Sequence, residues 1–334
     1  MAEALPQPVV LSAEECELAV NVPELMEEIA QGFIDYTADR TVVPPVGYLG
    51  FTEPTGDVHL KYGYVKGGDV FVIKVAAGFP ENSLRGLPTG DGCMLVFSSH
   101  TGFLLAVLLD RSRLTDLRTA VAGAVAARAL APRVIERIGI LGSGVQARLQ
   151  PLMLQQVTAC REIALYARSG ERALACASDL ELMGYRVKVC TTASEVAEGC
   201  ELIVTTTASR VAHFPAGLVR AGTHVTAVGA DAPGKQELDP SLFARAEVVV
   251  ADSIAQCADH GDLAFALASG DIALHRVREL GTVLADPAFG RTSETQISIA
   301  DLTGVAVQDI VIATHVLRRT SGDVMKLDAI PHSA

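Results

Sequence analysis

The chain has 334 residues, of which 49% are hydrophobic, and a formal net charge of −12. This length and apolar content can supply the cores of two domains, which excludes a disordered protein. Clusters of Lys and Arg, the footprint of a nucleic-acid surface, are missing, and no apolar run approaches the ~20 residues that span a bilayer. The seven cysteines lack CxxC spacing, which is typical of a reducing compartment. We therefore expect a soluble, cytoplasmic protein that binds neither nucleic acid nor membrane.

The N-terminal part of the chain predicts a domain built largely of neighbouring strands. It opens with a short strand and a helix, because Ser12 and Glu15 have the spacing of a capping box. Five β-rich runs follow, separated by Gly, Pro, Asn and Asp: VGYLGF, VHLKYGYV, VFVIKVAAG, GCMLVFSS and GFLLAVLLD. The alanine-rich segment 114–132 ends at a proline and predicts a helix.

Strands and helices alternate in the next part of the chain. The predicted strands are RIGIL, EIALYA, RVKVC, ELIVTT, HVTAVG and EVVVAD, and helical patterns lie between the first few. Short apolar strands that alternate with helices indicate a doubly wound parallel sheet of the Rossmann type, so the fold class is α/β. Residues 303–320 predict one more helix.

A glycine-rich turn, ILGSGVQA, lies between the first of these strands and a helix. Gly142 permits the tight turn, Gly144 lets the backbone approach a pyrophosphate, and Ala147 lets the helix pack close to the strand. The helix N-terminus offers unpaired N–H groups to phosphates. In this context the turn predicts a nicotinamide dinucleotide site.

The end of the second strand bears on the choice between NAD and NADP. An acidic residue there binds the ribose hydroxyl of NAD, but this chain has ALYARSGER. Arg168 and Ser169 could hold the 2′-phosphate of NADP, or Arg168 could be a solvated loop residue. NAD and NADP both stay open, with NADP slightly favoured.

Four charged residues suggest substrate chemistry. Lys74 lies inside an apolar β run, where a lysine is costly unless its amine reaches solvent or an anion. Arg118 could bind a carboxylate with two hydrogen bonds, although taken alone it and Lys74 could both be surface residues. The run HVTAVG is followed closely by Asp231 and Lys235, which form either an ordinary polar turn or a pair of charges in a cleft.

The ordered set VIKVAAGFPEN, TDLRTA, ILGSGVQA, TAVGADAPGKQEL and DLTGVAVQD resembles the ornithine cyclodeaminase/mu-crystallin family over nearly the whole length. The resemblance implies a homodimer. It also implies an α+β domain for substrate binding and dimerisation, at residues 1–119 completed by the C-terminal helix within 304–334. The Rossmann domain then spans residues 120–303.

The resemblance also implies roles for single residues. Asp231 would shuttle protons, and Lys74 is assigned a second, catalytic role besides its contact with the substrate carboxylate. The implied substrate ligands are Arg40, Lys61, Lys74, Thr89, Arg118 and Lys235. The implied cofactor ligands are Thr119, Gly142, Ser143, Gly144, Val145, Gln146, Arg168, Ser169, Thr205, Thr206, Thr207, Val228, Gly229 and Ala230. No metal ligands are expected.

The reaction implied by the resemblance is redox-neutral. Hydride leaves Cα of a small diamino acid, the side-chain amine attacks the resulting imine, ammonia departs, and the cyclic imine is reduced again. Ornithine would give proline. One departure concerns VHLKYGY, where Lys61 stands instead of an acid that would meet the distal ammonium. If Lys61 points into the pocket, a distal anion or a neutral tail is favoured; if it points outward, nothing changes.

Two other functions therefore stay open on the same scaffold. One is a ketimine reductase or amino-acid dehydrogenase with net redox chemistry, which Arg168 and Lys61 would suit. The other is a crystallin-like protein that binds NADPH and a small ligand without turnover. The combination of Asp231, Lys74 and Arg118 argues against the second, because pure binding has no need of a proton shuttle.

Overall fold

The computed structural model describes residues 7–320, which belong to two compact units. The first unit comprises Met1–Arg118 with Ala306–Ala334, and the second comprises Thr119–Val305. The boundaries expected from the sequence are 119/120 and 303/304. Segments 1–6 and 321–334 of the expected first domain lie outside the described residues.

The first unit contains a mixed sheet in the order β1-β7-β6-β5-β4-β2, with β3 paired to β4. β1 runs parallel to β7, and the other pairings in this sheet are antiparallel. Ser12 and Glu15 form the predicted capping box at the start of α1, and the five predicted β runs are strands. The bounds are β1 Val9–Ser12, α1 Ala13–Leu18, α2 Val22–Thr37, β2 Thr41–Val42, β3 Gly47–Thr52, β4 Thr55–Val65, β5 Val70–Gly78, β6 Gly90–Ser98, β7 Leu104–Leu109 and α11 Ala306–Thr320, with a 3-10 turn at Pro80–Arg85.

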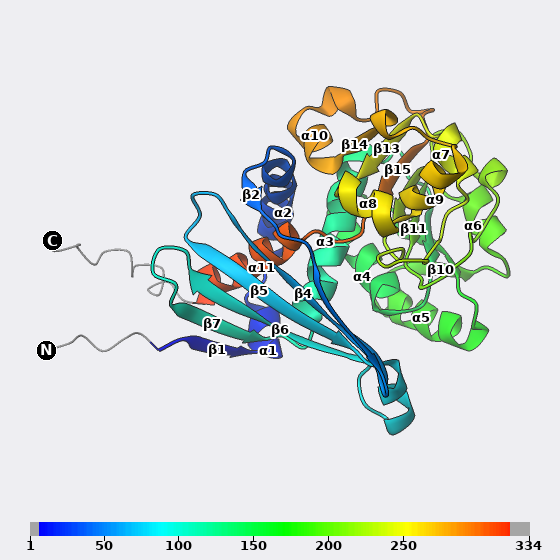
Figure 1. Ribbon diagram of the computed structural model, residues 1–334. Helices are drawn as coiled ribbons and strands as arrows, with labels where there is room; N and C mark the ends of the chain where they lie inside the picture. Colours follow the sequence, from blue (N-terminus) through cyan, green and yellow to red (C-terminus); the bar gives the residue numbers. More distant parts are fainter. Residues whose placement is uncertain (1–6, 321–334) are drawn as a thin grey trace, which may run out of the picture. The chain divides into compact units, whose positions relative to one another are not determined.

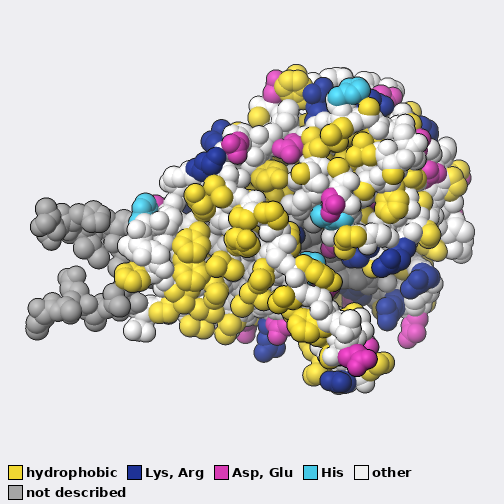
Figure 2. Space-filling model, in the orientation of Figure 1, with side chains coloured by type: hydrophobic (Ala, Val, Ile, Leu, Met, Phe, Trp, Pro, Cys, Tyr) yellow, Lys and Arg dark blue, Asp and Glu magenta, His cyan; other side chains and the backbone are white. Residues whose placement is uncertain are grey.

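The two faces of this sheet differ in what covers them. On β5 the side chains of Val70, Val72 and Lys74 are buried, and α11 packs against β4 and β5 (Figure 1). The alternate side chains of β5 are partly exposed to solvent. Among them, Phe71 stacks on Phe97 of β6, with 4.8 Å between the ring centroids. Figure 2 shows hydrophobic side chains gathered over these strands. The period of two therefore separates a helix-covered face from an apolar face that remains open.

The second unit is the predicted doubly wound parallel sheet, in the order β10-β9-β8-β11-β12-β15-β13-β14. The six predicted strands are present. The remaining bounds are α3 Arg113–Leu130, β8 Ile138–Leu141, α4 Val145–Leu154, β9 Glu162–Tyr166, α5 Gly170–Leu182, β10 Arg186–Val189, α6 Ala193–Gly199, β11 Leu202–Thr205, β12 His224–Ala227, α7 Ser241–Arg245, β13 Val248–Ala251, α8 Ile254–His260, α9 Asp262–Ser269, β14 Val277–Glu279, α10 Leu280–Ala285 and β15 Ser298–Asp301, with 3-10 turns at Ala216–Leu218, Leu274–Arg276 and Pro287–Phe289. The division between the units falls within α3.

Two strands of this sheet were missing from the sequence-based prediction. β15 is inserted between β12 and β13, in the interior of the sheet, and β14 forms one edge. β15 has only four residues, all buried, and its place depends on pairing with two strands that are distant in sequence. No helix within residues 7–320 is both long and apolar enough to cross a bilayer.

Candidate functional site

The first unit contains a buried ionic cluster that joins Lys74, Arg118 and Asp309. Nζ of Lys74 lies 2.9 Å from Oδ2 of Asp309, and Nε of Arg118 lies 3.0 Å from Oδ1 of the same carboxylate. Arg118 also donates to Oε1 of Gln308 at 2.6 Å. The side chains of Lys74 and Arg118 are 4% and 6% exposed, so neither is a surface residue. The two predicted carboxylate ligands therefore converge on one point, where they already hold an acid.

Sequence reasoning missed Asp309. The sequence showed only a carboxylate within the apolar helix VAVQDIVIATHV, and such a residue is costly to bury unless cations meet it. Burial opposes ionisation of Asp309, but Arg118 and then Lys74 outweigh it and lower its pKa. The carboxylate is therefore a permanent anion at neutral pH.

The amine of Lys74 is poised to change its charge near neutrality. Its pKa is lowered to about 7, mainly by burial, with smaller contributions in the same direction from Arg118 and Lys61, while Asp309 opposes the shift. A second acid, Asp110, lies within electrostatic range of Lys74, and burial raises its own pKa to about 6. Asp110 accepts the backbone N–H of Leu114 at the start of α3. An anion that binds beside Lys74 would favour its protonated form.

The orientation of Lys61 is settled by strand register. Lys61 on β4 is the direct cross-strand partner of Lys74 on β5. Opposite residues of an antiparallel pair point to the same face. Gly63, two residues further on β4, is on that face as well, because a Cβ there would meet Ile310 of α11. Lys61 therefore points the same way as Lys74, and its charge acts on both Lys74 and Asp309.

Two other predicted substrate ligands of the first unit lie elsewhere. Arg40 is largely exposed and pairs with Asp35 of α2 at 2.7 Å. Thr89 lines a hollow of about 540 Å³ together with residues that include Phe79, Asp91 and Arg111. Its described lining includes neither Lys74 nor Arg118. The structure thus groups Lys61, Lys74 and Arg118 and leaves Arg40 and Thr89 outside that group.

In the second unit, the glycine turn has the form that a dinucleotide needs. Gly142 adopts a φ of 129°, and a Cβ there would lie 2.3 Å from Oγ1 of Thr206. A Cβ on Gly144, by contrast, would meet no described atom within 4 Å. Gly144 begins α4 without a side-chain cap, so the first N–H groups of the helix receive no side-chain acceptor there. The backbone is thus open where a pyrophosphate would approach.

Arg148 orients this turn. Its Nη1 donates to the carbonyls of Ser143 at 2.6 Å and Gly144 at 3.1 Å, and its Nε donates to Asp179. In a planar trans peptide the N–H points opposite to the carbonyl. The N–H groups of Gly144 and Val145 therefore point away from Arg148, which leaves them directed at a ligand. Arg148 was not predicted from the sequence.

The other predicted cofactor residues of this half have local structural roles. The carbonyl of Thr119 accepts from Gln150, and Oε1 of Gln146 accepts from the same amide. Arg168 follows β9 and is exposed, while Ser169 caps α5 by accepting the N–H of Arg172. The guanidinium of Arg168 is therefore exposed at the carboxyl end of β9.

The loops after β11 and β12 are joined by Glu237, whose role the sequence did not reveal. Its fully buried carboxylate accepts from Oγ1 of Thr205, from N and Oγ1 of Thr207, and from the N–H of Gly229, at 2.6–2.7 Å. Thr206 instead donates to the carbonyl of Leu141. The predicted cofactor segments Thr205–Thr207 and Val228–Ala230 are therefore fixed to each other at the carboxyl edge of the sheet, where ligands of open α/β sheets bind.

Two further acids support this edge. The segment CADHGDL joins two helices, because α8 ends at His260 and α9 begins at Asp262. Asp262 is buried and accepts the backbone N–H groups of Glu237 and Leu238, each at 2.8 Å. Burial and the charge of Glu237 raise the pKa of Asp262 to about 7. Burial and the neighbouring Asp262 likewise raise the pKa of Asp301.

Asp231 and Lys235 form an ion pair of 2.5 Å on the loop after β12. The side chain of Asp231 is 52% exposed and that of Lys235 is 28% exposed. The pair therefore stands at the carboxyl edge of the sheet, close in sequence to the segment that Glu237 fixes. An accessible carboxylate at this edge is able to exchange protons.

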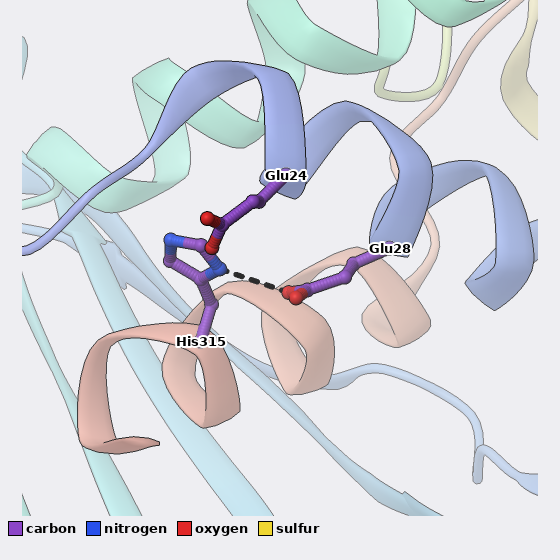
Figure 3. Close-up of side chains that lie close together, drawn as sticks. All are labelled: Glu24, Glu28 and His315. Carbon is purple, nitrogen blue, oxygen red and sulfur yellow. Dashed lines mark hydrogen bonds and ion pairs between the residues drawn. The ribbon is translucent and has the colours of Figure 1, made fainter. Parts of the chain in front are cut away.

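One group of described side chains has the spacing of a metal site: Glu24, Glu28 and His315, drawn in Figure 3. The side-chain nitrogen and oxygen atoms of this group already bond other groups of the protein. Nε2 of His315 accepts the backbone N–H of Asn21 at 3.0 Å, and Nδ1 lies 2.9 Å from Glu28. Arg318 and Arg319 pair with Glu28 and Glu24. The group is an ionic clamp between α2 and α11, and it gives no reason to infer a metal.

Comparisons with known proteins agree with this geometry. An uncharacterized cyclodeaminase of Sinorhizobium fredii is 42% identical over 279 residues, covering 83% of this chain and 84% of its own. The structure of an archaeal alanine dehydrogenase dimer with bound NAD is 33% identical, with a TM-score of 0.86 over 93% of this chain and 95% of that one. The NAD⁺ complex of the iminosuccinate reductase of Paracoccus denitrificans is 27% identical, with a TM-score of 0.85 over 94% and 96%. The model of the ornithine cyclodeaminase/mu-crystallin family matches residues 6–323. The chain therefore belongs to the ornithine cyclodeaminase/mu-crystallin family.

Proposed function

We propose that this protein is an NAD-dependent oxidoreductase that interconverts a small α-amino acid and its imine with net consumption of the cofactor. The observation that favours a net redox reaction over cyclodeamination is that Lys61 lies directly opposite Lys74 on the neighbouring strand. A cyclodeaminase substrate presents a second, cationic amine, and a lysine on the carboxylate-binding face repels it. The open backbone at Gly144 and the NAD bound by the two structural neighbours support the cofactor assignment.

The residues would divide the work as follows. Arg118 and Lys74 bind and orient the substrate carboxylate, with Asp309 holding both cations in place. When NAD is bound, it supplies the acceptor for the two electrons and the hydrogen that leave Cα. The substrate nitrogen loses a proton, and water then converts the imine to an oxo acid and ammonia. Lys74 and Asp231 are the groups that we assign to proton transfer, since Lys74 has a pKa of about 7 and Asp231 is accessible.

A cyclodeaminase is the second candidate, and the Asp231–Lys235 pair favours it. In that reaction Asp231 would move protons while the side-chain amine attacks the imine and ammonia departs. The S. fredii relative carries a cyclodeaminase name, which supports the same alternative. Such a reaction would recycle the cofactor and turn ornithine into proline.

We also propose a homodimer formed through the open face of the first sheet. Exposed aromatic side chains on this face include Tyr62 and Tyr64, at 39% and 38% exposure, and the Phe71–Phe97 stack lies in the same sheet. Monomeric proteins rarely leave such contiguous apolar surface open. The alanine dehydrogenase neighbour is named as a dimer, which supports a second copy as the occupant.

The deciding experiment follows NADH and ammonia together with purified protein. Incubation with NADH, ammonia and a 2-oxo acid should oxidise one NADH per amino acid formed. Incubation with ornithine and catalytic NAD⁺ should yield no proline beyond the amount of cofactor. Proline and ammonia in excess of the cofactor would instead establish the cyclodeaminase. Absence of turnover in both assays would exclude both candidates.

A further inference from the structure

The loops after β11 and β12 lie on one side of a reversal in the strand order of the second sheet. The order β10-β9-β8-β11-β12 changes direction between β8 and β11. A dinucleotide binds across such a reversal, with one mononucleotide half over the strands on each side. In this fold the end of the second strand, here β9, meets the adenosine ribose. The loops after β11 and β12 are therefore the ones that the nicotinamide half would meet.

One carboxylate, that of Glu237, holds the backbone of both loops. Its Oε1 accepts the N–H and the hydroxyl of Thr207, at 2.6 and 2.7 Å. Its Oε2 accepts the N–H of Gly229 and the hydroxyl of Thr205, each at 2.7 Å. Asp262 in turn accepts the backbone N–H of Glu237 at 2.8 Å. Each carboxylate oxygen thus binds one backbone N–H, and the two N–H groups belong to different loops.

An amide in place of this carboxylate could not make the same bonds. A carboxylate accepts at both oxygens, whereas a glutamine side chain has one acceptor oxygen and one NH₂ donor. In either orientation of the amide, the NH₂ would face a backbone N–H, that of Thr207 or that of Gly229. A buried N–H without an acceptor is costly. We therefore expect Glu237→Gln to displace one loop from the other.

The bonds to Glu237 also set the direction of two carbonyl groups. The N–H of a trans peptide points opposite to the carbonyl of the preceding residue. The carbonyls of Thr206 and Val228 therefore point away from Glu237. A Cβ on Gly142 would lie 3.0 Å from the carbonyl oxygen of Thr206, so this carbonyl faces the glycine turn. Glu237 thus fixes backbone that borders the place where a pyrophosphate would approach.

We propose that Glu237 is a positioning residue for the nicotinamide half of the cofactor. It fixes the loops after β11 and β12 against each other and beside the glycine turn. Its side chain is fully buried, so it acts through these loops and not by contact with the cofactor. The inference rests on the cofactor binding that the proposed function assumes, and it holds for net oxidoreduction and for cyclodeamination alike.

The test compares NADH with ADP-ribose, which has the same adenosine, pyrophosphate and second ribose but no nicotinamide ring. Calorimetry measures the Kd of both ligands for the wild type and for Glu237→Gln. The control is Glu247→Gln. Glu247 is also a glutamate that accepts a backbone N–H, from Ile297 at 2.8 Å, but it precedes β13 at the amino edge of the same sheet.

The wild type should bind NADH at least about tenfold more tightly than ADP-ribose. Glu237→Gln should bind NADH about tenfold more weakly than the wild type does, and ADP-ribose within about threefold of the wild type. Glu247→Gln should match the wild type for both ligands.

Other outcomes overturn the inference in distinguishable ways. An equal loss of affinity for both ligands in Glu237→Gln would show that Glu237 only stabilises the fold, and unchanged NADH binding would refute the inference as well. The expected ligand pattern without turnover of any substrate would refute the proposed function and leave the role of Glu237 standing. If the wild type binds neither ligand, both fail together.

Hydrogen exchange on the wild type gives a test that does not depend on the variants. Saturating NADH should slow exchange in segments 203–210 and 225–232 at least about threefold more than saturating ADP-ribose does. Equal protection by the two ligands would contradict the proposal even if Glu237→Gln folds poorly.

Discussion

Nζ of Lys74 lies 2.9 Å from Oδ2 of Asp309, and both side chains are almost fully buried. The carboxylate is held from its other oxygen by Arg118 at 3.0 Å. One acid thus organises the two cations that the proposed function assigns to the substrate, and both depend on it for their position.

Replacement Asp309→Asn should destabilise the protein strongly, because it leaves two buried cations without their anion. Loss of one partner of a buried ion pair costs about 3–5 kcal/mol, which urea unfolding would measure. Asp35→Asn is the control: Asp35 pairs with the largely exposed Arg40, where an ion pair contributes about 0–1 kcal/mol. An equal loss of unfolding free energy in the two variants would show that Asp309 stabilises the protein no more than a surface ion pair does.

Anion binding should weaken as pH rises through about 7. Burial lowers the pKa of Lys74 to about 7, so its amine is charged below that pH and neutral above it. A bound carboxylate stabilises the charged form, so its affinity should fall by up to about tenfold per pH unit above pH 7. Lys74→Arg, which stays charged, should give a flat profile over the same range. A flat profile in the wild type would count against the role of Lys74.

Gly144→Ala should keep the fold and lose the cofactor. Its added methyl group meets no described atom within 4 Å, and its φ of −83° suits alanine. The methyl would occupy the space through which the backbone approaches a pyrophosphate, so we expect NADH to bind at least about tenfold more weakly by fluorescence titration. Gly142→Ala, with a φ of 129° and a clash with Thr206, should instead lower the melting temperature. Unchanged NADH binding in Gly144→Ala would place the cofactor elsewhere.

Asp262 should make the protein less stable as pH rises toward 7. Burial and Glu237 raise its pKa to about 7, so the folded protein binds a proton that the unfolded chain releases near pH 4. The stabilisation is therefore present at low pH and is lost as pH rises through about 7. Asp262→Asn should remove this slope, so that its free energy of unfolding, compared with that of the wild type, is more favourable by about 2–3 kcal/mol at pH 8 than at pH 5. Asp259→Asn, an exposed neighbour, should keep the slope of the wild type.

Local patterns carried most of the fold. Ser12 and Glu15 predicted a cap because both partners lie within one helical turn. The glycine turn was recognisable because its strand, its glycines and its helix are contiguous in the sequence. Strands such as β5 and β8 were also predictable from the local sequence, because each is a short apolar run bounded by turn residues.

Relations between distant segments could not be read in this way. β15 enters the sheet between β12 and β13 because of hydrogen bonds to strands far away in the chain, and its four residues have no periodicity of their own. In the sequence Glu237 and Asp262 resemble ordinary polar residues of loops. Only the tertiary structure shows that their carboxylates accept backbone N–H groups, from Gly229 and Glu237 respectively.

The sequence by itself determined the two kinds of domain, the dinucleotide turn and the presence of Lys61, Lys74 and Arg118, because each depends on local spacing or on residue type. It left open which way Lys61 points and which acid meets Lys74. Strand register decided the first, by placing Lys61 opposite Lys74. The packing of α11 on the sheet decided the second, by bringing Asp309 to two buried cations. Both are products of tertiary structure, because side-chain direction on a strand and the partner of a buried charge depend on the neighbouring elements.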